Sequence, residues 1–386
     1  MYDVIVVGAR CAGAPTAMLF ARAGYRVLLL ERATALRDTL STLYIHQPGV
    51  ALLARWQILD AVVATGCPPI EQATYQVADV RLRGCAVPAD GVRTAYAPRR
   101  QSLDAALVRA AVDAGAELRM GSTVQDLVYG DSRVVGVRHR GAAVMIEERG
   151  RLVVGADGMR SMVAALVKAE MVVEDPTMTC AYYTYWAGVK AGFEIYDAPG
   201  SNVGAIPTSD GLTLIGAYFP RAQFDRVRLD AATAYRNGIR RTAPQLYERV
   251  AVGEQAERLR GTGDQLNFFR EATGPGWVLV GDASHHKDSI TARGITDAFV
   301  QAQLLVESVG ADLHDPARLD AALARYEEER DEALAYSYYS TLSAAELAVP
   351  AHKVDSLREI AANPVLVDRY FGVLAGTCRV EDLSLP

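Results

Sequence analysis

The fold is decided by residues 2–32, YDVIVVGARCAGAPTAMLFARAGYRVLLLER. The apolar run at residues 4–7 is typical of a strand that is buried on both faces of a parallel sheet. Gly8 ends that run, and a helical pattern follows up to Gly24. A second apolar run, at residues 27–30, ends in Glu31. The order strand, glycine turn, helix and strand predicts a βαβ dinucleotide-binding unit.

This unit has the chemistry to hold a pyrophosphate. The first helical turn directs backbone N–H groups and the positive end of the helix dipole at a bound anion. Glu31 lies about 20 residues further on, where an acid can accept a hydrogen bond from a ribose hydroxyl. Of the pattern G-x-G-x-x-G, Gly8 and Gly13 are present, but Arg10 replaces the middle glycine. Either Arg10 points away or its guanidinium lies along the pyrophosphate, and a βαβ crossover without a nucleotide stays an alternative.

Composition limits the function classes. The chain has 386 residues, of which 50% are hydrophobic and 22% are charged, so we expect two or three globular domains. The net charge of -6 and the lack of a basic run argue against nucleic-acid binding. Five scattered cysteines without C-x-x-C spacing predict neither a disulfide framework nor a metal site. Since no signal-like or bilayer-spanning run is found, we expect a cytoplasmic protein without a membrane partner.

Three segments between residues 33 and 161 carry further candidate side chains. In the polar stretch after Glu31, Tyr44 and His46 have the chemistry of catalytic residues, although a satisfied imidazole is the alternative for His46. Arg100 precedes an amphipathic helix, where its cation can reach a cofactor phosphate or remain a solvated charge. The strand at residues 152–154 runs into GADGMRS, whose Asp157 needs a hydrogen-bonding partner if it is buried.

An apolar strand that ends in glycine and an acid occurs again late in the chain. The strand at residues 277–280 is followed by GDASHHKDSITARG, at residues 281–294, and by a helix. Together with GARCAG and GADGMRS, this segment resembles the FAD-dependent monooxygenases of the aromatic-hydroxylase type, the class A flavoproteins, which are related to geranylgeranyl reductases and flavin halogenases. The resemblance covers about residues 1–330 and rests on a dinucleotide motif, a DG motif and a GD motif in the family's order.

The resemblance implies an α/β fold, with a Rossmann-type FAD-binding domain, an inserted and mostly antiparallel β-sheet substrate domain, and C-terminal helices. We expect the FAD-binding domain at residues 1–71, 98–179 and 265–330, the substrate domain at 72–97 and 180–264, and the helices at 331–386. The positions implied to contact FAD are Gly8, Ala9, Ala12, Gly13, Glu31, Arg32, Arg100, Val124, Asp157, Asp282, Arg293, Gly294 and Ile295.

The chain departs from the family around the GD motif. Ser289 replaces the usual proline, Ala292 the first glycine before the helix, and Thr296 the customary asparagine. These positions flank the flavin ring in the family. Gly294 is kept, and the helix that starts there can direct its positive end at the flavin N1–C2=O locus, where negative charge accumulates.

Aromatic residues crowd the strand-like segments between residues 180 and 261. This is the region where the family builds its substrate pocket. We therefore expect Tyr185 and Trp186 to contact the substrate, with simple packing as the alternative.

The expected activity is that of an FAD-dependent monooxygenase. NAD(P)H would reduce FAD, and one atom of O2 would pass through C4a-hydroperoxyflavin into an electron-rich small molecule, an aromatic or polyketide-like secondary metabolite. His46, Tyr44 or His285 would act as the proton-transferring group. A separate flavin reductase is left open as a partner, and neither the substrate nor the oligomeric state is specified by any motif.

Three alternatives remain. A flavin-dependent reductase of isoprenoid double bonds is kept because the motif sequences GARCAG and KDSITARG are unusual. A flavin-dependent halogenase is also kept, although the W-x-W-x-I-P signature of tryptophan halogenases is absent: residues 183–188 read YTYWAG. Outside enzymes, the chain could be a flavin-carrying scaffold or a redox sensor.

Overall fold

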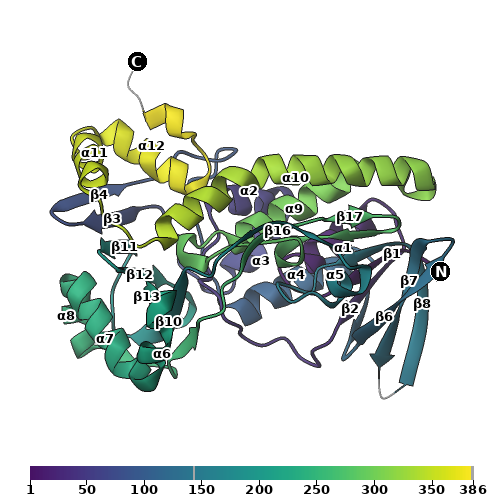
Figure 1. The fold of residues 1–386 in the computed structure, drawn as a ribbon, viewed down its shortest axis with the longest axis horizontal. Helices are drawn as coiled ribbons and strands as arrows, with labels where there is room; N and C mark the ends of the chain where they lie inside the picture. The colour runs from purple at the N-terminus through teal and green to yellow at the C-terminus, as the bar shows by residue number, and fades with distance from the viewer. Residues whose placement is uncertain (142–143, 384–386) are drawn as a thin grey trace.

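A computed structural model describes residues 1–141 and 144–383 of the chain and shows a mixed α/β protein (Figure 1). The predicted βαβ unit is confirmed: β1 (Tyr2–Val7), α1 (Gly13–Arg22) and β2 (Val27–Glu31) follow one another. Strand β1 lies between β2 and β8 (Val144–Gly155) and is parallel to both. All three strands are buried where they pair, as the apolar runs predicted.

The first large sheet has the order β17-β18-β8-β1-β2-β5. Its remaining strands are β17 (Thr273–Gly274), β18 (Trp277–Leu279) and β5 (Glu117–Met120). A hairpin is formed by β6 (Thr123–Gly130) and β7 (Arg133–Gly141), and β7 also pairs with β8. Because β18, β8, β1 and β2 are parallel, their carboxyl ends meet at one edge. That edge brings together the loops that carry all three motifs.

Helices cover both faces of this sheet. On one face, α1 packs with α4 (Arg100–Asp113), α9 (Gly294–Val309) and α10 (Pro316–Ala345) around the largest apolar cluster. Two shorter helices, α2 (Gln47–Arg55) and α3 (Leu59–Val63), contribute to the same cluster. On the other face, α5 (Met162–Val167) and the hairpin pack on the sheet.

The second large sheet is mostly antiparallel and has the order β14-β10-β13-β12-β11-β3-β4. Its strands are β3 (Ala73–Val77), β4 (Val80–Gly84), β10 (Thr179–Ala187), β11 (Phe193–Ala198), β12 (Ser201–Pro207), β13 (Thr213–Pro220), β14 (Glu254–Gln255) and β15 (Arg260–Thr262). The early hairpin β3–β4 joins this sheet because β3 pairs with β11 in parallel. A separate small sheet contains β9 (Met171–Asp175), β16 (Asn267–Arg270) and β19 (His285–His286).

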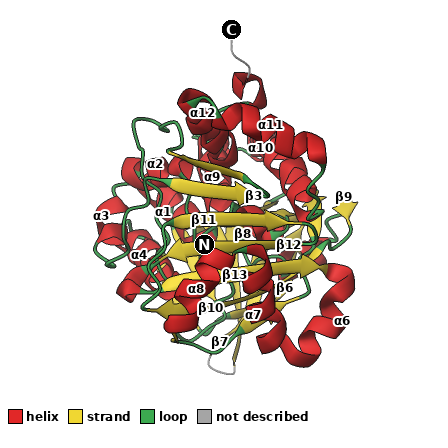
Figure 2. Ribbon diagram, turned by 90° about the vertical axis from the view of Figure 1, so that its left-hand side faces the viewer, coloured by secondary structure: helices red, strands yellow, loops and turns green. Residues whose placement is uncertain are grey.

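Two groups of helices enclose the second sheet. Apolar side chains of α7 (Ala231–Thr242) and α8 (Pro244–Val252) pack on one of its faces, beside the short α6 (Phe224–Val227). Side chains of α11 (Ala351–Ala361) and α12 (Pro364–Ala375) pack on the other face. Figure 2 shows the strands between these two groups. The C-terminal helices therefore become part of the surroundings of this sheet.

Short 3-10 helices occupy Ser209–Gly211, Arg221–Gln223, Arg228–Asp230, Gly281–Ala283, Ser289–Thr291, Asp312–His314 and Val380–Leu383. Within residues 1–141 and 144–383, none of the helices combines the length and apolar character that a bilayer-spanning segment requires.

Candidate active site

A polar cavity of about 660 Å³ lies at the carboxyl edge of the first sheet. The ends of β1, β2 and β8, the loop after β18 and the first turn of α9 all contribute to its wall. Ten of the thirteen residues predicted to contact FAD line it: Gly8, Ala12, Glu31, Arg32, Arg100, Val124, Asp157, Asp282, Gly294 and Ile295. The three motifs therefore converge on one cavity, hereafter the polar cavity.

Two of the three other predicted residues, Ala9 and Gly13, shape the loop behind the polar cavity. The backbone N–H of Ala9 donates to Glu31 Oε2 at 2.9 Å. The other oxygen of Glu31 accepts the N–H of Ala33 at 2.9 Å. Gly13 packs so tightly that a Cβ there would lie 1.8 Å from the carbonyl oxygen of Gly8. Glu31 therefore fixes the glycine loop in addition to lining the cavity.

Arg10 lines the polar cavity, and its guanidinium is held there by protein groups. It donates to Asp104 Oδ2 at 2.8 Å and to the carbonyl of Arg37 at 3.2 Å. Asp104 is fully buried and also forms an ion pair with Arg100 at 3.2 Å. Sequence reasoning missed Asp104, although its spacing of four residues from Arg100 on a helix is the signal that could have indicated it.

The two motif acids differ in how they are satisfied. Asp157 accepts hydrogen bonds from Ser161 Oγ at 2.5 Å and from the N–H of Met162 at 2.7 Å, at the start of α5. Burial raises the pKa of Asp157. Asp282 is exposed in the polar cavity, and its carboxylate accepts no hydrogen bond from any described residue. Asp282 is therefore the acid that is free to accept hydrogen bonds from the hydroxyl groups of a ligand.

A buried ion cluster supports the start of α9. Lys287 and Asp297 form an ion pair with side chains only 4% and 3% exposed, and both line the polar cavity. Arg293 adds a contact with Asp297 at 3.5 Å and donates to the carbonyl of Leu374 at 3.3 Å. The structure thus places the predicted cofactor residue Arg293 in this cluster, with its guanidinium turned toward α12 and outside the cavity wall.

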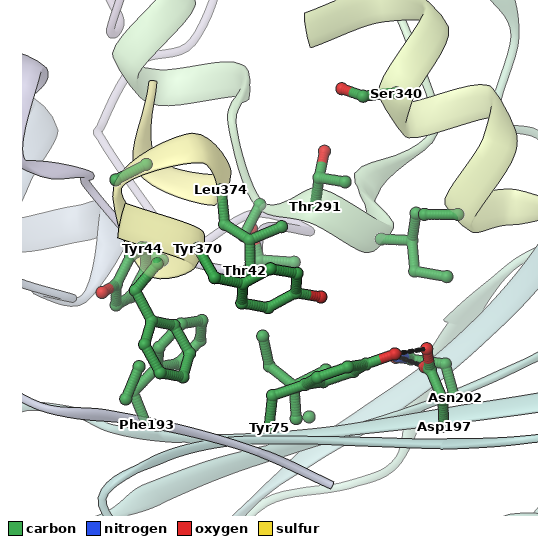
Figure 3. A pocket seen from close by; sticks show the side chains of 18 of the residues that line it. Thr42, Tyr44, Tyr75, Phe193, Asp197, Asn202, Thr291, Ser340, Tyr370 and Leu374 are labelled. Carbon is green, nitrogen blue, oxygen red and sulfur yellow. Dashed lines mark hydrogen bonds between the residues drawn. The ribbon is translucent and has the colours of Figure 1, made fainter. Parts of the chain in front are cut away.

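A second cavity of about 640 Å³, hereafter the apolar cavity, lies between the second sheet and the C-terminal helices. Figure 3 shows aromatic side chains around it: Tyr44 stacks on Phe193 with ring centroids 4.1 Å apart, and Tyr75 on Tyr370 at 5.8 Å. Polar groups lie at one end, where Tyr75 and Asn202 donate to Asp197 at 2.5 and 2.7 Å (Figure 3).

The two cavities meet. Thr42 and Ala292 line both of them. Ala292 has a φ of 55°, in the left-handed region that glycine favours, at the position where the class A flavoproteins have glycine. A ligand in the apolar cavity therefore lies against the wall of the polar cavity.

The predicted catalytic residues do not form one cluster. Tyr44 and His46 both line the apolar cavity, with ring centroids 4.7 Å apart. His46 Nε2 lies 3.2 Å from the carbonyl oxygen of Thr291, which can only accept, so this nitrogen carries the proton. Burial and the charge of Arg293 lower the pKa of His46 to about 3, so the ring is neutral near pH 7.

His285 lies apart from this pair. It lines the polar cavity and packs against Phe269 and Tyr338, with ring centroids at 4.4 and 5.7 Å. Burial places the pKa of His285 well below its ordinary value. A proton-transferring role for His285 toward a ligand in the apolar cavity is therefore not supported by its position.

The aromatic residues predicted to contact the substrate lie away from both cavities. Neither Tyr185 nor Trp186 is among the described residues that line the two cavities. Trp186 faces α7 and donates to Tyr235 Oη at 3.0 Å, while the guanidinium of Arg99 lies over the ring of Tyr185 at 4.1 Å. Other aromatic side chains face the apolar cavity instead: Tyr44, Tyr75, Phe193, Tyr218, Tyr370 and Phe371.

Known proteins resemble this chain over most of its length. Digeranylgeranylglycerophospholipid reductase 2 of Methanopyrus kandleri is 26% identical over 362 residues, 90% of this chain and 86% of the relative. The protein of the same name from Methanothermobacter thermautotrophicus is 27% identical over 345 residues, 84% of this chain and 82% of the relative.

Solved structures show the same fold. The flavin-dependent brominase Bmp2 gives a TM-score of 0.86 at 18% identity, covering 99% of this chain and 96% of the brominase. PqsL of Pseudomonas aeruginosa, described as a probable FAD-dependent monooxygenase, gives 0.73 at 19% identity, covering 96% of this chain and 99% of PqsL.

A family model described as an FAD binding domain matches residues 1–336. This match contains all three motifs and both sheets. The protein therefore belongs to the FAD-binding-domain family of class A flavoproteins and is an FAD-dependent oxidoreductase.

Proposed function

We propose that this enzyme inserts one oxygen atom from O2 into an electron-rich and largely apolar small molecule, with NAD(P)H as the electron donor. The observation that carries the proposal is the contact between the two cavities at Thr42 and Ala292. One cavity has the acids, arginines and helix ends that suit FAD, and the other has aromatic walls that suit an unsaturated ligand.

The residues present fit FAD. The free carboxylate of Asp282 suits ribityl hydroxyls. The N-terminal ends of α1, at Ala12, and of α9, at Gly294, lie at the wall of the polar cavity, where the positive end of each helix dipole favours negative charge. Arg32 and Arg100 add positive charge for phosphates. When bound, FAD would supply the redox chemistry that activates O2.

The chain's own residues would orient the substrate toward Thr42 and Ala292, where the two cavities meet, hereafter the junction. The stacked pairs Tyr44–Phe193 and Tyr75–Tyr370 offer flat faces against which an aromatic ring can pack. The Nε2–H of His46 donates to the carbonyl oxygen of Thr291, so His46 fixes the backbone beside Ala292. Because burial lowers the pKa of His46 to about 3, its other ring nitrogen is a weak base, and we assign His46 a positioning role.

Charge around the apolar cavity favours a neutral or cationic substrate. Asp197 forms an ion pair with Lys353 at 3.1 Å, and no described residue forms an ion pair with the exposed Glu71 or Glu346, which also line the cavity. This excess of carboxylates disfavours an anionic group such as a phosphate. The charge pattern therefore supports a small neutral substrate over a phospholipid.

A second candidate function is the reduction of isoprenoid double bonds. It is favoured by the sequence similarity to the two archaeal digeranylgeranylglycerophospholipid reductases, which extends over 84% or more of the chain. The apolar cavity is also compatible with an isoprenoid chain.

An oxygen electrode separates the two functions. We expect the FAD-loaded enzyme with NADH or NADPH to consume O2 when neutral phenolic compounds are added, and mass spectrometry to show a product heavier by one oxygen atom. Catalase, added as a control, reveals O2 uptake that yields only hydrogen peroxide. A product that gains two hydrogen atoms under argon, from an isoprenoid substrate, would replace the oxygenase proposal with the reductase.

A further inference from the structure

A hydrogen bond joins the walls of the two cavities. Tyr218, on β13, lines the apolar cavity, and Ser289, in the loop before α9, lines the polar cavity. Their hydroxyl oxygens are 3.0 Å apart. Ser289 stands where the class A flavoproteins have proline, which has no hydroxyl group, so this link is a feature of the present chain.

The direction of this hydrogen bond follows from the next group, Gln265. The backbone N–H of Ser289 donates to Gln265 Oε1 at 3.1 Å, and a backbone N–H can only donate, so the amide atom at this position is the oxygen. Ser289 Oγ lies 2.5 Å from the same oxygen. Two oxygens this close need a proton between them. The hydroxyl proton of Ser289 is therefore given to Gln265, and Tyr218 must donate to Ser289.

The remaining bonds run in the same direction. The amide nitrogen of Gln265 donates to Thr179 Oγ1 at 2.8 Å, and Thr179 donates to Asp288 Oδ2 at 2.6 Å. Asp288 is 1% exposed and also accepts the N–H of Ile290 at 3.1 Å. Each hydrogen bond in this series is therefore donated in the direction of the buried carboxylate of Asp288. This order favours Tyr218 as the donor to Ser289.

We infer that the phenolic oxygen of Tyr218 acts as a hydrogen-bond acceptor toward the apolar cavity and selects substrates that carry an O–H or N–H donor. The proton of Tyr218 is committed to Ser289, so its oxygen can offer only lone pairs to a ligand. Because Ser289 lines the polar cavity, the selected donor is held beside the junction. The inference rests on the proposed function only in taking the apolar cavity as the substrate site.

The test compares a donor with its blocked form. The FAD-loaded protein is titrated in a calorimeter with β-naphthol and with its methyl ether, which has no donor. We expect the wild type to bind β-naphthol about tenfold more tightly, the value of one neutral hydrogen bond. In Tyr218→Phe this preference should disappear because β-naphthol binds more weakly. In Ser289→Ala the hydroxyl of Tyr218 can donate a hydrogen bond to the ether oxygen. This variant should therefore bind the ether more tightly than the wild type does.

Tyr183→Phe is the matched control. Tyr183 belongs to the same sheet, its hydroxyl donates to the carbonyl of Thr39 at 3.3 Å, and it is not among the described residues that line the apolar cavity. Its variant should keep the preference of the wild type. Equal binding of both probes by the wild type, no binding of β-naphthol, or an unchanged preference in Tyr218→Phe would overturn the inference. The titration measures binding and not turnover. If the protein bound β-naphthol selectively but inserted no oxygen in the oxygen-electrode experiment, the proposed function would be wrong and this inference would stand.

Discussion

Replacing Gly8 by alanine is expected to give a protein that does not retain FAD and whose free energy of unfolding is lower by about 3 kcal/mol. Gly8 has a φ of +100°, which an alanine adopts only with strain. A Cβ at this position would also lie 2.4 Å from the carbonyl oxygen of Ala156, so β1 and β8 must separate where they form the wall of the polar cavity.

Gly24→Ala is the matched control for this substitution. Gly24 follows α1 and has a φ of +89°, but a Cβ there meets no atom within 4 Å. Its variant should lose only the backbone term of about 1 kcal/mol and keep FAD. The measurement is the flavin absorbance per chain after desalting, together with urea unfolding. The explanation would be wrong if the two variants lost the same stability and both kept a full complement of FAD.

Asp297→Ala is expected to lower the free energy of unfolding by about 3–5 kcal/mol, because it leaves the ammonium group of Lys287 buried without its partner. Burial lowers the pKa of Lys287, so this site disfavours an isolated charge. The same substitution removes the contact of Arg293 with the start of α9. Unfolding in urea, followed by circular dichroism, measures the loss.

Lys287→Met is the comparison variant. It should lose less stability than Asp297→Ala because Asp297 keeps Arg293 as a partner at 3.5 Å and the methionine fills most of the same volume. An equal or larger loss in Lys287→Met would show that the lysine, and not the compensation of its charge, determines the stability of the site.

The FAD-binding half could be predicted because its signals are local. Apolar runs that end in glycine or in an acid specify parallel strands, and parallel strands bring their carboxyl ends to one edge. Asp157 and Asp282, which are far apart in the sequence, therefore line one cavity. The contact between Arg10 and Asp104 could not be predicted from the sequence, because both orientations of Arg10 are compatible with the glycine motif.

The substrate side could not be predicted in the same way. Strand β10 is buried on both faces over almost its whole length, so the alternation of its residues does not tell which face lines a cavity. This is why the sequence favoured Tyr185 and Trp186, which are not among the described residues that line the two cavities. The aromatic wall is instead completed by Tyr370, from a C-terminal helix beyond the family match, and no local pattern links that helix to Tyr75 on β3.

The substitutions around the GD motif acquire a physical meaning in the structure. Ala292 adopts the left-handed conformation of the glycine it replaces, at a cost of about 1 kcal/mol. The hydrogen bond from His46 to the neighbouring Thr291 helps to hold that conformation. Ser289 exchanges the rigidity of proline for a hydroxyl that links the two cavities.

A crystal structure of the complex with FAD tests the central claim most directly. We predict one FAD per chain, with its ribityl hydroxyls at Asp282 and its isoalloxazine ring at Thr42 and Ala292, where the two cavities meet. A ring placed away from these two residues, or a polar cavity that takes up no FAD, would contradict the account.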